Sequence, residues 1–278
     1  SELRFISGPA EQLLDEATVP RPTHAIFFQA PLGFVEDFAE FRGLDNLINT
    51  WGYFLEFNSD LESAPGFLRA QIASNKLPER WRYRLMELMQ PSETLLTYRE
   101  GESRKWFQLP VLAASDRPVR PIAENVVALI ILPRLSETEA EPGDVTGTTI
   151  VPEYALAPKY EYDSITDGEG SSEAKAHLNS RHQLPPVVQV TMVALDEPSA
   201  SRLADRFGKK APDLKIDSPR ALFRKAEQLK IPPAESDLSD LQELEKNLVE
   251  LKCNYRVFTT AVSIKGAKWS RSIPIVND

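Results

Sequence analysis

Cysteine and long apolar runs are nearly absent from this chain of 278 residues. The one cysteine, Cys253, cannot form an intramolecular disulfide, and a zinc site built from several thiolates is excluded with it. We expect Cys253 to be a small buried side chain rather than a reactive thiol. The longest apolar run, Val126 to Leu132, is far shorter than the roughly 20 residues with which a helix crosses a bilayer.

Positive charge is also scarce. The chain has 32 Lys and Arg residues against 41 Asp and Glu residues, which gives a net charge of −9. This balance opposes nonspecific attachment to phosphate backbones and anionic lipids, so we expect no nucleic acid among the partners. The apolar fraction of 42% is that of an ordinary folded protein, and we expect one globular domain over residues 1–278.

The familiar catalytic motifs are missing too. The sequence has no Gly-x-Ser-x-Gly elbow, no phosphate-binding Gly-x-x-x-x-Gly-Lys loop, no Gly-x-Gly-x-x-Gly turn and no His-Glu-x-x-His pair. Its three histidines, His24, His177 and His182, do not stand at the spacing of a metal site. Nothing selects two carboxylates for glycoside hydrolysis from the 41 acidic residues. We therefore predict no catalytic residue, no bound cofactor and no enzyme activity.

One acidic loop offers oxygen ligands for calcium: Asp163, Asp167, Glu169 and Glu173. An EF-hand loop would need an oxygen side chain where Ile165 stands and a bidentate glutamate where Ala174 stands, so the match is poor. The alternative is a flexible, solvated loop. These four residues are our only metal candidates.

The stretch around which the chain is organised is Val126 to Leu132. It is rich in β-branched residues and bounded by Asn125 and Pro133, which indicates a strand buried on both faces. We expect the strand from Glu124 to Leu132 to be the buried centre of the fold. Two further β-rich runs, 185–195 and 255–264, are predicted to pair with it.

Weaker patterns fill the first half of the chain. Alternation predicts strands at 3–9, 24–30 and 52–57, with a short helical turn between the first two. Residues 34–51 carry apolar side chains at helical spacing, and 59–77 has the composition of an irregular connection.

A further strand is predicted from Trp81 to Met89. Its aromatic residues alternate with Arg82 and Arg84, so we expect a half-exposed strand with the arginines on the solvent side. Residues 92–98 are typical of a short helix or an extended segment, and Trp106 and Phe107 are expected to anchor the loop that follows.

Helical signals dominate residues 196–251. Asp196 is placed to cap one helix, and Ser218-Pro219 is expected to open a second. The third, within 238–251, has a capping box at Ser239 and Gln242 and a leucine stripe that we expect to pack on the sheet. The fold class is therefore predicted as α+β, with mainly antiparallel sheets and a helical elaboration at 196–251.

Five segments together carry a family resemblance: 1–9, 89–93, 123–135, 184–196 and 255–270. This combination resembles the Verru_Chthon cassette protein C family of prepilin-like proteins. The Glu124-Asn-Val strand and the following Pro185-Pro-Val-Val-Gln-Val-Thr strand are also similar to the J-type minor pseudopilin of type II secretion. The resemblance implies a pseudopilin-like arrangement of the sheets. It also implies a noncatalytic minor subunit of a type II secretion or type IV pilus-like assembly.

The resemblance has consequences for what lies before Ser1. It implies a precursor with a basic leader, a prepilin peptidase site and an apolar N-terminal helix, none of which is in the printed sequence. That helix would anchor the subunit in the inner membrane before assembly and would be its only membrane contact. The globular domain would face the periplasm or the cell surface. Its partners would be other pilin-like subunits and secreted cargo.

Two alternatives remain open. The first is a secreted carbohydrate- or peptide-binding module, or adhesin, that uses the region of Trp81, Trp106 or Trp269 and the long loops. An exposed aromatic platform in a groove would favour it. The second is a hydrolase with converging carboxylates, which a cleft with two acids and a raised carboxyl pKa would favour.

Overall fold

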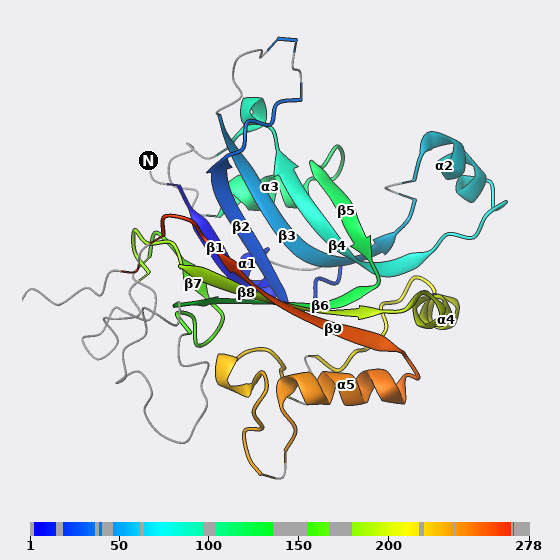
Figure 1. The fold of residues 1–278 in the computed structure, drawn as a ribbon. Helices are drawn as coiled ribbons and strands as arrows, with labels where there is room; N and C mark the ends of the chain where they lie inside the picture. Colours follow the sequence, from blue (N-terminus) through cyan, green and yellow to red (C-terminus); the bar gives the residue numbers. More distant parts are fainter. Residues whose placement is uncertain are drawn as a thin grey trace, which may run out of the picture.

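The structure is a computed structural model, in which two antiparallel sheets and a few helices make a mixed α/β fold consistent with α+β (Figure 1). It describes residues 3–14, 19–36, 39–40, 47–61, 64–96, 104–135, 155–166, 180–216, 220–235, 237–267 and 269. Within these ranges, no helix has both the length and the apolar character to span a membrane.

Sheet A has six strands in the order β5-β4-β3-β2-β1-β7, and all neighbours are antiparallel. The strands are β1 (Phe5–Pro9), β2 (His24–Pro31), β3 (Ile48–Ser59), β4 (Trp81–Gln90), β5 (Val119–Glu124) and β7 (Tyr162–Asp163). The strands predicted at 3–9, 24–30, 52–57 and 81–89 are confirmed. The helical turn between the first two is α1 (Ala10–Leu13).

The predicted helix at 34–51 is absent from its described residues, because 34–36 are irregular, 39–40 lie in a turn and β3 already begins at Ile48. Residues 48–51 pair with β2 from Pro31 back to Phe28, and this pairing outweighs the local helical spacing. Residues 37–38 and 41–46 lie outside the described ranges.

Sheet B has three strands in the order β6-β8-β9, again antiparallel: β6 (Val126–Arg134), β8 (Val187–Leu195) and β9 (Tyr255–Ser263). The predicted pairing of 185–195 with the Val126 to Leu132 strand is confirmed, and β6 is buried along nearly its whole length. The run at 255–264 pairs with β8 instead of β6. Two details differ from the prediction. β8 is the middle strand, and Glu124 ends β5 because Asn125, at φ 65°, turns the chain from sheet A into sheet B.

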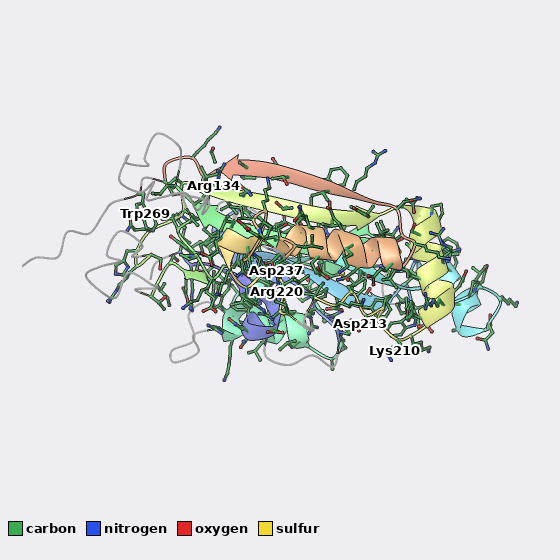
Figure 2. All side chains as sticks on the ribbon, turned by 90° about the horizontal axis from the view of Figure 1, so that it is seen from below. Arg134, Lys210, Asp213, Arg220, Asp237 and Trp269 are labelled. Carbon is green, nitrogen blue, oxygen red and sulfur yellow. The ribbon has the colours of Figure 1, made fainter. Side chains whose placement is uncertain are left out.

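The sheets and helices stack in layers. α1 and α3 (Lys105–Leu112) cover one face of sheet A, where Phe27, Phe54 and Phe107 are fully buried. β6 packs against the opposite face, over β2, β3 and β4. α4 (Glu197–Phe207) and α5 (Asp240–Glu250) pack on sheet B, and α5 lies along it in Figure 2.

The helix caps follow the sequence closely. Asp196 accepts a hydrogen bond from the N–H of Ser199 at 2.9 Å and begins α4. Ser239 and Gln242 form the predicted capping box of α5, whose leucine stripe is buried in the core beneath sheet B. The second predicted helix is wrong over residues 220–225, where the chain makes bends before the short 3₁₀ turn η5 (Ala226–Gln228). The backbone of Phe223 is held there at φ 57°, with its N–H donated to Asp240. Residues 217–219 are not described.

Two connections were assigned less well. The segment at 59–77 contains a helix, α2 (Gly66–Ala73), which begins directly after Pro65. At 92–98 the described part contains a single 3₁₀ turn, η1 (Ser92–Thr94). Trp106 and Phe107 are buried in α3 and so do hold the loop after it. Of the predicted acidic loop, Asp163 lies in β7, and residues 167–173 lie outside the described residues.

The exposed side expected for β4 is wrong. Arg82 and Arg84 are 5% and 1% exposed, because the buried Asn58 and the exposed carboxylates of Glu124 and Glu197 reach their guanidinium groups. Arg84 donates to the carbonyl and side-chain oxygens of Asn58 at 2.6 and 2.7 Å and to Glu124 at 3.1 Å. Arg82 forms a bidentate pair with Glu197 at 2.6 and 2.7 Å. A charge can be buried when its partners satisfy it, and alternation alone does not reveal those partners.

Candidate functional site

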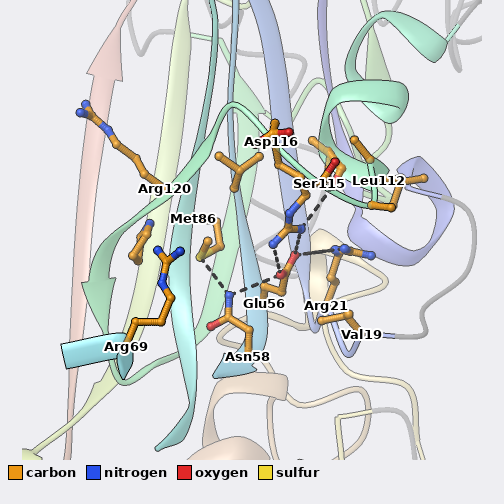
Figure 3. Close-up of a pocket in the computed structure, with 16 residues that line it drawn as sticks. Val19, Arg21, Glu56, Asn58, Arg69, Met86, Leu112, Ser115, Asp116 and Arg120 are labelled. Atoms are coloured by element: carbon orange, nitrogen blue, oxygen red, sulfur yellow. Dashed lines mark hydrogen bonds and ion pairs between the residues drawn. The ribbon is translucent and has the colours of Figure 1, made fainter. Parts of the chain in front are cut away.

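A cleft of about 890 Å³ opens on the helix-covered side of sheet A. It lies between β3, β4, β5 and the loop that follows α3 (Figure 3). Its charged lining residues are Arg21, Arg69, Arg117, Arg120, Glu56 and Asp116.

Glu56 lies at the base of this cleft and is 1% exposed. Arg21 Nη2 donates to its Oε2 at 3.0 Å, and Arg117 Nη2 donates to its Oε1 at 2.9 Å. Burial alone would raise the pKa of Glu56, but the hydrogen bonds and charges of Arg117 and Arg21 outweigh burial and hold the pKa below its ordinary value. A carboxylate held ionised, with both oxygens occupied, is poorly placed for general acid or base chemistry.

The charge balance of the cleft is positive, and we call it the cationic cleft. Arg21, Arg69 and Arg117 contribute three positive charges, against two negative charges from Glu56 and Asp116. Arg120 also lines the opening, but its guanidinium points away from Glu56 in Figure 3 and pairs with Glu87 at 2.7 Å. A cleft lined in this way favours an anionic ligand, because guanidinium groups match carboxylate and phosphate oxygens.

The calcium hypothesis receives no ligand set from the described residues. Asp163 forms an ion pair with Arg4 and accepts a hydrogen bond from the N–H of Ile165 at 3.2 Å. Asp167, Glu169 and Glu173 lie outside the described ranges. Where residues are described, no group of three or more His, Cys, Asp or Glu side chains could hold a metal ion.

The binding-module alternative uses the region of Trp81, Trp106 or Trp269, and these tryptophans are buried or half-buried. Trp106 is 4% exposed. Trp81 packs on Phe57 and lies under the Lys209 ammonium, 5.9 Å from its ring centroid. Trp269 is half-buried and packs on Tyr162, with 6.4 Å between the ring centroids. None of them stands as an exposed platform.

His24 and Cys253 lie in the core of the fold. Cys253 is buried, as expected. The Nδ1 atom of His24 accepts the N–H of Ile131 at 3.0 Å, while its Nε2 atom lies 2.9 Å from the Phe223 carbonyl and donates to it. Burial lowers the pKa of His24 to about 4, so the ring is neutral with both nitrogens occupied. His177 is not described.

One buried carboxyl, Asp240, has a raised pKa. Burial raises it to about 6. Its two oxygens accept hydrogen bonds from Arg220 and from the N–H of Phe223, both at 2.8 Å. These contacts tie the start of α5 to the preceding bend, and Asp240 does not line the cationic cleft.

Sequence reasoning missed a half-buried apolar surface that we call the open face. It consists of Phe28, Trp51, Tyr53 and Met89 on sheet A and Val190, Met192, Phe258 and Val262 on sheet B. In Figure 1, the upper parts of β2 to β5 have no described helix or strand in front of them. The signal was present in β3, where Trp51, Tyr53 and the buried Leu55 stand two residues apart and therefore lie on the same face of the strand.

The outer edge of β9 is the second feature that was missed. β9 pairs with β8 on one side and lies at the rim of the molecule in Figure 2. Most of its residues are exposed, including Phe258 at 49% and Val262 at 51%. A strand with this composition normally belongs to a core, so the exposure of β9 is unusual.

Comparisons of this chain with models of protein families, with curated protein sequences and with solved structures give no match.

Proposed function

We propose that this protein is a noncatalytic minor pilin-like subunit, or pseudopilin, of a type II secretion or type IV pilus-like assembly. It acts through contacts with other subunits and with cargo, in the periplasm or at the cell surface. The observation that carries the proposal is the exposed β9 edge beside the open face. An apolar surface of this kind is suited to assembly, because neighbouring chains bury it.

The open face gives a place for the helix that the family resemblance implies before Ser1. Half-buried aromatic and thioether side chains, such as Phe28, Trp51 and Met89, present a broad surface that can accept an apolar helix. The Glu87 carboxylate within this surface is paired with Arg120 and accepts a hydrogen bond from Trp51. Leu3 is 42% exposed and leads directly into β1, which pairs with β2 beside this surface. In the proposed subunit the helix covers the sheet A part of the open face, leaves β9 exposed and also anchors the precursor in the inner membrane.

The noncatalytic part of the proposal is supported by the cationic cleft. A hydrolase would need a carboxyl group with a raised pKa in a cleft. Glu56 has a lowered pKa, and the raised Asp240 is enclosed by Arg220 and the Phe223 backbone.

The test uses the full-length protein in its native host. Phe258→Asp places a charge on the β9 surface, and we expect recovery of the subunit with its assembly partners to fall at least 10-fold. The matched control is Phe67→Asp on α2, because Phe67 is even more exposed, at 68%. The control should assemble normally. Equal recovery of the two variants would contradict the proposal.

The cationic cleft favours a second candidate, a binding module for an acidic peptide. An oligoglutamate peptide serves as the probe, and its affinity is measured by calorimetry at low and high salt. Arg69→Glu should weaken binding at least 10-fold, because it reverses a charge at the cleft. The matched control is Arg256→Glu on β9, which makes the same charge change outside the cleft and should leave binding unchanged. Equal losses in both variants would mean that only net charge matters.

A further inference from the structure

The edges of the two sheets are protected to different degrees. β5 carries Pro121 and a register shift beside it, and β7 is only two residues long. Prolines, bulges and short strands are the usual devices that stop a sheet edge from pairing with another chain. β9 has none of them, because its nine residues contain no proline and its pairing with β8 runs without a register shift.

The outward-facing backbone groups of β9 can be identified from two hydrogen bonds. The N–H of Ile264 donates to the Pro186 carbonyl at 2.9 Å, and the Asn254 carbonyl accepts from Asp196 at 3.1 Å. Residues of an antiparallel strand direct their N–H and C=O groups alternately to the two sides. Even-numbered residues of β9 therefore bond to β8. The odd-numbered residues direct their N–H and C=O groups to the outer edge: Tyr255, Val257, Thr259, Ala261 and Ser263.

The side chains of β9 are arranged symmetrically about Thr260. Phe258 and Val262 stand two residues before and after it and point to the same face of the sheet. In an antiparallel pair of two β9 strands centred on Thr260, each Phe258 lies opposite the Val262 of the second copy. Cross-strand pairs of aromatic and β-branched residues stabilise a sheet. The odd-numbered residues then face each other, as hydrogen bonding between the strands requires.

Charge is compatible with the same register. The strand between Arg256 and Lys265 has no charged residue. When two copies pair about Thr260, Arg256 lies opposite Ile264 rather than opposite the second Arg256. Like charges placed directly opposite each other would destabilise the pair, and this register avoids them.

We propose that β9 pairs antiparallel with β9 of a second copy of this chain, about a two-fold axis at Thr260. This inference rests on the proposed function, that of an assembling subunit, and names one of its partners. The two copies join their three-stranded sheets into one continuous sheet. Standard interfaces bury at least about 1,200 Å² in total, and a single strand edge is a small surface by comparison. We therefore expect the isolated pair of copies to be weak.

A disulfide trap tests both the pairing and its register. Residues opposite each other without mutual hydrogen bonds have Cα atoms about 4.5 Å apart, within the range that a disulfide spans. Thr260→Cys, in a full chain that also carries Cys253→Ala, places two such residues at the axis. The matched control is Thr259→Cys, whose two copies are diagonal neighbours, about 7–8 Å or more apart, and cannot bridge without backbone movement.

We expect covalent dimer to form at least 10-fold faster with Thr260→Cys than with Thr259→Cys under mild oxidation. Circular dichroism verifies that both variants are folded. Equal rates, or no dimer from either variant, would overturn the inference, and a faster Thr259→Cys dimer would overturn the register. If no dimer forms while Phe258→Asp still abolishes assembly, β9 takes a strand from a different protein: self-pairing is then wrong and the assembly function stands. If no dimer forms and Phe258→Asp has no effect on assembly, both the self-pairing and the assembly function are wrong.

Discussion

β6 and β9 are the two edge strands of one sheet, and both are rich in β-branched residues, but their surroundings are opposite. The outer edge of β6 is closed by side chains from the beginning of β2. Thr23 Oγ1 accepts the N–H of Leu129 and His24 Nδ1 accepts the N–H of Ile131, both at 3.0 Å. The next outward residue, Pro133, has no N–H, and its carbonyl accepts from Leu156 at 2.9 Å.

At the outer edge of β9, no described residue supplies comparable partners. The two edges therefore differ in what the described part of the chain places beside them. The closed edge belongs to the core, and we propose that the open edge belongs to an interface with another chain. The following predictions test this contrast in order of decreasing effect.

Removing the histidine that closes β6 should have the largest effect. His24→Leu leaves the buried Ile131 N–H and the Phe223 carbonyl without their partners, and each such loss costs about 1–3 kcal/mol. We expect the free energy of unfolding, measured by urea denaturation at pH 7, to fall by about 3 kcal/mol or more. A change below about 0.5 kcal/mol would mean that β6 does not depend on this closure.

The same histidine should make stability depend on pH. Its pKa is about 4 in the folded chain, against 6.5 as the ordinary value, so the unfolded chain binds the proton first as the pH falls. The stability that neutral His24 contributes is complete above about pH 6.5 and is lost between pH 6.5 and pH 4. A shift of this size corresponds to about 3 kcal/mol. Urea denaturation at several pH values checks it, and the decline above pH 4.5 should be absent in His24→Leu.

The second closing residue gives a smaller effect. Thr23→Val keeps the shape of the side chain but removes the acceptor for the Leu129 N–H. We expect a loss of about 1 kcal/mol, the usual net value of one hydrogen bond. A larger loss would point to strain at position 23, where φ is 63°.

On the open edge, the matching substitution should have almost no effect. Thr259→Val on β9 should change the free energy of unfolding by less than about 0.5 kcal/mol. In dilute protein, amide hydrogen exchange should be fast at Val257, Thr259 and Ala261 and slow at the even-numbered residues between them. Uniform protection along β9 would contradict the open edge.

Sequence patterns predicted the parts of this fold that depend on local chemistry. Strands β1 to β4, β6, β8 and β9, the Asp196 cap and the Ser239 capping box follow from composition and spacing within a few residues, whereas β5 and β7 were not predicted. The errors arise where distant residues decide. The arginines of β4 are buried because Asn58, Glu124 and Glu197 reach them, and residues 48–51 extend because β2 pairs with them.

The candidate site could not be predicted for the same reason. Arg21, Glu56 and Arg117 come from three separate segments, and no motif joins them. The composition of β9 indicated a core strand, because nothing in a single strand tells whether a neighbour will cover its second edge. Which strand or loop of the chain lies beside a strand edge is decided by the topology of the whole fold.

The most direct test of the assembly account is the mature N-terminus of the natural protein, read from the encoded precursor and measured by mass spectrometry. The account predicts a short basic leader, cleaved before an apolar helix of roughly 20 residues that leads into the present chain. An ordinary secretory signal ending directly before Ser1, or a further folded domain there, would contradict it and would favour the peptide-binding alternative at the cationic cleft.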